Sequence, residues 1–202
     1  MSELNMRNSK FKKILVHIDG LEKGSVFAIA DFSEYAQPKT VSKALERLSK
    51  HGVIEKVVRG IFWLPCGDGS SPDPEKVAEA LARENNWSIT PSGETAIHKM
   101  GLSKKKPKNW TYLTNGAYRS YSFANNEISM LHSDSPYYEN LSKKTSLLIQ
   151  VIKAYGQEKL DERIIHMIRD KYNDSEIRLA MEESKRLPKR FSCTIKSIFE
   201  GI

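Results

Sequence analysis

The sequence has few of the residues that cross-link a chain or anchor it in a bilayer. Only two cysteines occur among 202 residues, Cys66 and Cys193, which is too few for a disulfide framework or a four-ligand zinc site. No run approaches the ~18 consecutive apolar residues of a membrane span, and the N-terminus has no apolar segment of the signal-peptide kind. We therefore expect a soluble cytoplasmic protein with no membrane association.

Motifs of catalysis and cofactor binding are also missing. The five histidines show no ligand spacing with each other or with cysteine. Ser92 lacks the Gly-x-Ser-x-Gly frame of a nucleophile elbow and is better explained as a helix cap. The turn-rich residues 66–75 lack the Gly-Lys-Ser or Gly-Lys-Thr ending of a phosphate loop, which favours an interdomain connection over nucleotide binding. We expect no catalytic residue, no metal, no cofactor and no enzymatic activity.

Positive charge is modestly in excess and unevenly spread. The chain has 32 basic and 25 acidic residues, for a net charge of +7. The first 66 residues carry 11 basic and 7 acidic side chains, and the other 136 carry 21 and 18. The N-terminal part is therefore the denser in positive charge, which weakly favours a nucleic-acid partner there.

Hydrophobic spacing predicts a particular order of elements in the first 66 residues. Apolar residues recur at i, i+3, i+4 and i+7 within 9–19 and again within 38–50, which indicates two amphipathic helices. Between them we expect a short strand at 26–29 and a short helix at 31–36, opened by a capping box of Asp31 and Glu34. Strands at 53–57 and 61–64, joined at Arg59 and Gly60, form a hairpin. This order is typical of a winged helix-turn-helix.

The second long helix, at 38–50, carries the residues best suited to a DNA groove. Burial of Val41, Ala44, Leu45 and Leu48 leaves a polar face outward. A solvated surface would explain that face by itself, but the preceding helix and turn and the following basic hairpin favour DNA contact. The predicted DNA-binding residues are Lys39, Thr40, Ser42, Lys43 and Arg47 on the helix, and Lys56 and Arg59 on the hairpin.

The remainder of the chain contains both helix-like and strand-like hydrophobic spacing. We expect helices at 77–86 and 92–100, strands at 87–90, 110–114, 118–123 and 128–132, and helices from 141 onward. Asn115 and Gly116 give a hairpin signal between the second and third of those strands. The predicted fold class is α+β. Its parts are a winged helix-turn-helix at 1–66, a linker at 67–75, and a mixed α+β domain at 76–202 with a small antiparallel sheet and C-terminal helices.

A second basic cluster follows the expected helix at 92–100. Lys104, Lys105, Lys106 and Lys108 surround Pro107. A solvated loop, an additional phosphate contact, and an electrostatic contact with an acidic partner are all consistent with this composition.

Two blocks of sequence resemble a known family. Residues 41–65, from Val41-Ser42-Lys43 to Phe62-Trp63-Leu64-Pro65, resemble the N-terminal winged helix of AbiEi-type antitoxins. Residues 89–103, followed by Tyr112 to Gly116, look like the domain that follows in that family. The likeness covers roughly residues 10–155. The chain departs from the family pattern at Lys104, Lys105 and Lys106, where relatives usually have uncharged residues.

The resemblance implies a DNA-binding autorepressor and antitoxin of a type IV toxin-antitoxin, or abortive-infection, module. Its partners would be repeated operator sites in double-stranded DNA and a nucleotidyltransferase-like toxin, with which it need not form a stable complex. Two alternatives stay open. The protein is an interaction module or solitary regulator whose second domain binds a protein or small molecule, or its C-terminal part acts chemically on nucleic acid.

Overall fold

The computed structural model describes residues 3–134 and 140–200 and has a mixed α+β fold, as predicted. The chain forms two compact units. Unit 1 comprises Met1–Trp87 and Ser120–Ile128, and unit 2 comprises Ser88–Arg119 and Ser129–Ile202. Within the described residues, no helix combines the length and the apolar character needed to cross a bilayer.

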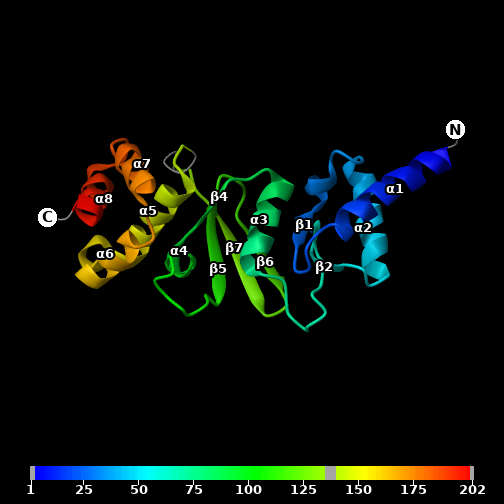
Figure 1. Ribbon diagram of the computed structural model, residues 1–202, viewed down its shortest axis with the longest axis horizontal. Helices are drawn as coiled ribbons and strands as arrows, with labels where there is room; N and C mark the ends of the chain where they lie inside the picture. Colours follow the sequence, from blue (N-terminus) through cyan, green and yellow to red (C-terminus); the bar gives the residue numbers. More distant parts are fainter. Residues whose placement is uncertain (1–2, 135–139, 201–202) are drawn as a thin grey trace. The chain divides into compact units, whose positions relative to one another are not determined.

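Unit 1 contains most of the predicted N-terminal elements in the predicted order (Figure 1). They are α1 (Glu3–Asp19), β1 (Val26–Ala28), the 3-10 helix η1 (Ile29–Phe32), α2 (Pro38–Lys50), β2 (Glu55–Val58), β3 (Ile61–Trp63) and α3 (Pro74–Asn85). The strands form an antiparallel sheet of order β1-β3-β2, with Val26 opposite Trp63 and Lys56 opposite Phe62. Helices α1 and α2 pack against each other.

The core of unit 1 is built from the stripes that the helical spacing predicts. Ile14 and Ile18 of α1 meet Leu45 of α2, and all three are fully buried. Phe32 of η1 is also fully buried, with its ring centroid 5.6 Å from that of Phe27 in an edge-to-face arrangement. Burial of each such side chain contributes about 1.5–3 kcal/mol, so this cluster holds α2 by its apolar face.

Two local predictions in unit 1 are wrong. Helix α1 begins at Glu3, six residues before the expected start, because no proline or glycine stops it there. Asp31 does not cap a helix that begins after it. It lies inside η1, and its Oδ2 accepts a hydrogen bond from the backbone N–H of Ala28 at 2.9 Å. The acidic side chain therefore reaches back over the first turn, as the second member of a capping box does.

Helix α3 packs within unit 1, and the turn-rich residues 67–75 connect two elements of that unit. Asp73 caps α3 by accepting from the N–H of Glu75 at 2.9 Å, and Pro74 occupies the first turn. The helix packs against β1, β3 and η1. Residues 67–75 thus lie within unit 1, which continues to Trp87 and also includes Ser120–Ile128.

The second sheet has four strands in the order β4-β5-β7-β6. Its strands are β4 (Ile89–Pro91), β5 (Asn109–Thr114), β6 (Arg119–Phe123) and β7 (Asn126–His132), with α4 (Gly93–Lys99) between β4 and β5. Strand β4 runs antiparallel to β5, with Ile89 opposite Thr114. Helix α4 packs against both β5 and α5.

The predicted hairpin at Asn115 and Gly116 is wrong. Strand β5 pairs with β7, so the strands on either side of this turn are not neighbours in the sheet. The tight connection instead lies between β6 and β7, where Ala124 has a φ of +45°. The Asn115 side chain accepts from the N–H of Ser88, and the Gly116 carbonyl accepts from His132. Residues distant in sequence therefore hold this turn by hydrogen bonds, and the turn does not join two paired strands.

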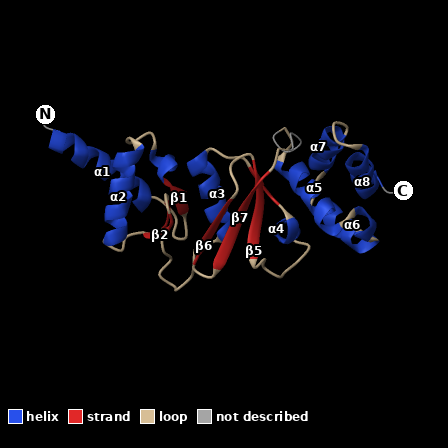
Figure 2. Cartoon of the chain, turned by 180° about the vertical axis from the view of Figure 1, so that it is seen from behind, coloured by secondary structure: helices blue, strands red, loops and turns tan. Residues whose placement is uncertain are grey.

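Helices at the C-terminal end complete unit 2 (Figure 2). They are α5 (Lys143–Tyr155), the 3-10 helix η2 (Gln157–Lys159), α6 (Glu162–Arg169), α7 (Asp174–Ser184) and α8 (Lys189–Glu200). Ser142, Asp161 and Asn173 cap α5, α6 and α7 through their side chains. Ile149, Ile168 and Ile195 lie in their common core.

Candidate functional site

Helix α2 buries one face and exposes the other, as the spacing predicts. Val41 and Leu45 are fully buried, and Leu48 is 4% exposed. On the opposite face Lys39, Thr40 and Lys43 are exposed to solvent. The first turn contains no acidic residue, so the positive end of the helix dipole and the cations of this turn act in the same direction. The surface suits a polyanion.

The side chains of Ser42 and Arg47 make contacts within the chain that the sequence does not reveal. Ser42 is half-buried, and its hydroxyl lies 3.5 Å from a carboxylate oxygen of Glu46. The Arg47 guanidinium lies over the Phe11 ring of α1, 5.1 Å from the ring centroid, although the side chain is exposed overall. This cation–π contact orders a long side chain, which lowers the entropy cost of any further contact that it makes.

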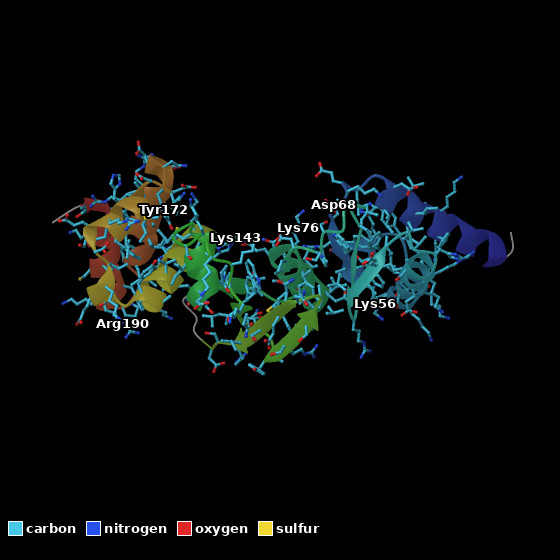
Figure 3. All side chains as sticks on the ribbon, turned by 90° about the horizontal axis from the view of Figure 1, so that it is seen from below. Lys56, Asp68, Lys76, Lys143, Tyr172 and Arg190 are labelled. Carbon is cyan, nitrogen blue, oxygen red and sulfur yellow. The ribbon has the colours of Figure 1, made fainter. Side chains whose placement is uncertain are left out.

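The hairpin after α2 is short, and its turn is anchored. Lys56 of β2, labelled in Figure 3, and Arg59 of the turn are both exposed. Gly60 has a φ of +84°, which glycine tolerates and other residues rarely adopt. Its carbonyl accepts from the N–H of Ile29 at 3.0 Å, and a Cβ at this position would lie 3.1 Å from a Glu84 oxygen. The hairpin therefore presents cations from a fixed position.

The C-terminal end of α3 holds the start of η1, which leads into α2. The Arg83 guanidinium donates two hydrogen bonds to the Asp31 carboxylate, at 2.8 and 3.0 Å. This interaction raises the pKa of Arg83, and the carboxylate that accepts both bonds is only partly exposed. Glu84 accepts from the N–H of Ala30 at 2.8 Å. Sequence reasoning missed these anchors, because contacts between residues more than 50 positions apart leave no periodic signal.

The lysine-rich loop lies in unit 2, between α4 and β5. Lys104, Lys105, Lys106 and Lys108 are all exposed, whereas Pro107 between them is buried. The backbone N–H of Lys105 donates to the Ser103 hydroxyl at 3.2 Å. The loop is thus fixed through its proline and backbone and directs its ammonium groups to solvent.

The seven predicted DNA-binding residues therefore lie on one helix and the hairpin that follows it, and the four loop lysines belong to the other unit. Within residues 3–134 and 140–200, no group of three or more His, Cys, Asp and Glu side chains is arranged to hold a metal ion. The surface on α2 and the β2–β3 hairpin offers charge, hydroxyls and a fixed backbone.

Comparison with known proteins gives a family and no named relative. Residues 13–178 match a family described as "Family of unknown function (DUF6088)". The match begins inside α1 and ends inside α7, so α8 lies outside it. No curated protein matches the chain. Because the match spans well over half of the residues, the chain belongs to the DUF6088 family.

Proposed function

We propose that unit 1 contains a winged helix-turn-helix that binds double-stranded DNA in a sequence-specific manner. Helix α2 is the recognition helix, and the β2–β3 hairpin is the wing. The protein represses transcription of its own operon and is not an enzyme. The observation that carries this proposal is the polar face of α2, where Lys39, Thr40 and Lys43 stay exposed after the apolar face is buried.

The chemistry of that face supports base and phosphate contact. The N-terminal residues of a recognition helix reach base edges, and here that end carries a lysine and a hydroxyl at positions 39 and 40. Lys56 and Arg59 on the hairpin are suited to backbone phosphates, which position a protein on the duplex without reading its sequence. One helix reads only a few base pairs, so the expected operator contains repeated half-sites.

The antitoxin part of the proposal rests on the resemblance of residues 41–65 and 89–103 to AbiEi-type antitoxins. In this proposal unit 2 counters a nucleotidyltransferase-like toxin, without a requirement for a stable complex. A reading frame for such a toxin directly downstream of the gene would support the assignment. Growth rescue by co-expression tests it, and a variant that lacks DNA binding separates rescue from repression.

Electrophoretic mobility shifts test DNA binding directly. The probe is the DNA immediately upstream of the protein's own reading frame, and a shuffled fragment of equal length is the competitor. Replacing Lys43 and Arg47 together with alanine should weaken binding to the upstream probe by at least about tenfold. The Lys12→Ala and Lys13→Ala double variant is the matched control, because it removes the same charge from exposed positions of α1, outside the proposed surface. Unchanged shifts for the double variant would refute the proposal.

A salt titration separates this proposal from a module that binds DNA only incidentally. Each phosphate contact adds about −0.9 to the slope of log affinity against log salt concentration. Contact through several cations of α2 and the hairpin therefore predicts a steep decline in affinity, and Lys56→Ala should make the slope about one unit shallower. A flat curve would favour a protein or small-molecule partner.

A further inference from the structure

The C-terminal helices border an open pocket that the DNA-binding proposal does not use. It has a volume of about 680 Å³ and lies where α5 ends, η2 follows and α8 begins. Tyr155 supplies accessible apolar lining, and Ile152 and Phe191 lie beneath the surface at 1% and 6% exposure. Helix α5 ends at Tyr155, and the following Gly156 has a φ of +79° that turns the chain away and no side chain to fill the space beside it. We name this site the C-terminal pocket.

Cations surround the apolar lining of the C-terminal pocket. Lys153, Lys159 and Arg190 line it and are exposed, and Glu158 is the acidic residue in the same lining. The Arg190 guanidinium lies 4.7 Å from the centroid of the Phe191 ring, and the Lys153 ammonium lies 5.6 Å from it. The lining thus carries three cationic side chains and one anionic side chain. The pocket therefore attracts negative charge.

The backbone around the C-terminal pocket is fixed in place. The Gln157 side-chain amide donates to the carbonyl of Arg190 at 2.7 Å, which links η2 to the first turn of α8. Figure 3 labels Arg190 among these helices. The Gln157 hydrogen bond holds η2 beside the first turn of α8, so a ligand loses little affinity to ordering of the backbone.

Two features favour an acidic peptide over a nucleic acid as the ligand. Phe191 is almost fully buried and has the charges of Arg190 and Lys153 beside its ring, so it does not present the open face on which a base stacks. Glu158 would also repel a continuous phosphate backbone. An extended peptide, whose carboxylates are spaced by neutral residues, can place carboxylates beside the cations, a neutral residue beside Glu158, and an apolar side chain against the half-buried Tyr155.

We infer that the C-terminal pocket binds an acidic peptide segment of a protein partner, with carboxylates held by Lys159 and Arg190 and an apolar side chain placed between them. This inference does not rest on DNA binding by unit 1. It gives the C-terminal helices a recognition role and locates that role at the junction of η2 and α8, where Arg190 and Phe191 of the lining lie beyond the family match.

Fluorescence anisotropy on the full-length protein tests this role. The probe is a short fluorescein-labelled peptide with the repeat Glu-Glu-Leu. Saturable binding with a Kd below about 1 mM is expected, which is the weak end of specific recognition. Arg190→Gln should weaken that binding at least about fivefold, and Lys159→Gln about threefold, since each removes one partner of a carboxylate.

Lys189→Gln is the matched control, because it removes the same charge from the same helix at a residue that does not line the pocket. Its effect should stay below about twofold. Thermal unfolding of each variant checks that the fold is retained. Absence of saturable peptide binding would overturn the inference, as would equal losses for Lys189→Gln and Arg190→Gln. Displacement of the peptide by single-stranded oligothymidine at equal concentration would also overturn it, because the site would then select polyanions in general.

Discussion

Helices α2 and α8 are built alike, yet the surfaces beside their cations differ. Each buries an apolar face, with Leu45 and Ile195 fully enclosed, and each directs lysine and arginine outward. On α2 the cations stand on an exposed face beside a short hairpin. On α8 Arg190 borders a pocket with apolar lining.

The comparison teaches that charge on a helix does not specify a ligand. An outward face that carries short hydroxyls and cations can enter a groove of DNA, whereas cations around an apolar hollow suit a segment with mixed carboxylate and apolar groups. In our proposals, similar cations on α2 and α8 thus serve two kinds of recognition, which the neighbouring side chains distinguish. The following tests challenge that distinction.

The largest effects on stability should come from truncating the buried apolar side chains. Leu45→Ala should lower the free energy of unfolding of unit 1 by about 2–5 kcal/mol, because it leaves a cavity around a fully buried side chain. Hydrogen exchange measured by mass spectrometry should show lost protection in α1 and α2. Ile195→Ala should act similarly on α8. Leu45→Met conserves volume and serves as a control. Equal loss of protection throughout the chain after either substitution would erase the distinction between the two regions.

A crossed binding experiment tests the distinction itself. The Lys43→Ala and Arg47→Ala double variant should lose at least about tenfold in affinity for the upstream DNA and keep its affinity for the Glu-Glu-Leu peptide. Arg190→Gln should do the reverse. Anisotropy titrations at one salt concentration measure both. If both variants lose both ligands, the two surfaces act as one general site for negative charge.

Loss of the contacts that hold η1 should have a smaller effect on the free energy of unfolding. Arg83→Ala removes the two hydrogen bonds to Asp31, and because the Arg83 side chain is 46% exposed the expected cost is about 1 kcal/mol or less. Urea denaturation measures this difference. Arg83→Lys restores the charge but not the planar pair of donors, so it should recover only part of the stability. Full recovery would show that charge alone matters here.

The smallest expected effect is a pH dependence in unit 2. His132 faces the Gly116 carbonyl at 2.7 Å through Nδ1 and the Asp134 carboxylate at 2.6 Å through Nε2. Both partners are acceptors, so the doubly protonated ring is favoured and the pKa of His132 is raised, chiefly by the Gly116 carbonyl. Its contribution to stability is therefore complete below its ordinary pKa of about 6.5 and is lost as the pH rises through the higher folded-state pKa.

Thermal unfolding between mildly acidic and mildly alkaline pH measures that contribution. The wild-type protein should lose stability as the pH rises, and His132→Asn should flatten the profile. His51→Asn, which removes an exposed imidazole next to α2, is the matched control. A His132→Asn profile parallel to that of the wild type would contradict this account.

Much of unit 1 follows from short-range patterns. Helix α2 has its predicted bounds, and six of the seven predicted DNA-binding residues are exposed, with Ser42 half-buried. Helical spacing identifies the buried stripe directly, and the remaining face follows by exclusion. The contact of Arg47 with Phe11 could not be predicted in the same way, because it depends on how α1 crosses α2.

The sequence by itself determined where α2 begins and ends, which side of it is apolar, and that Gly60 permits a tight turn, because these depend on residues within a few positions of each other. Only the tertiary structure decided that α3 packs within unit 1, that β5 pairs with β7, and that Lys159 and Arg190 border one pocket. Those arrangements join residues far apart in the chain, where the free energy of packing and strand pairing overrides local preference.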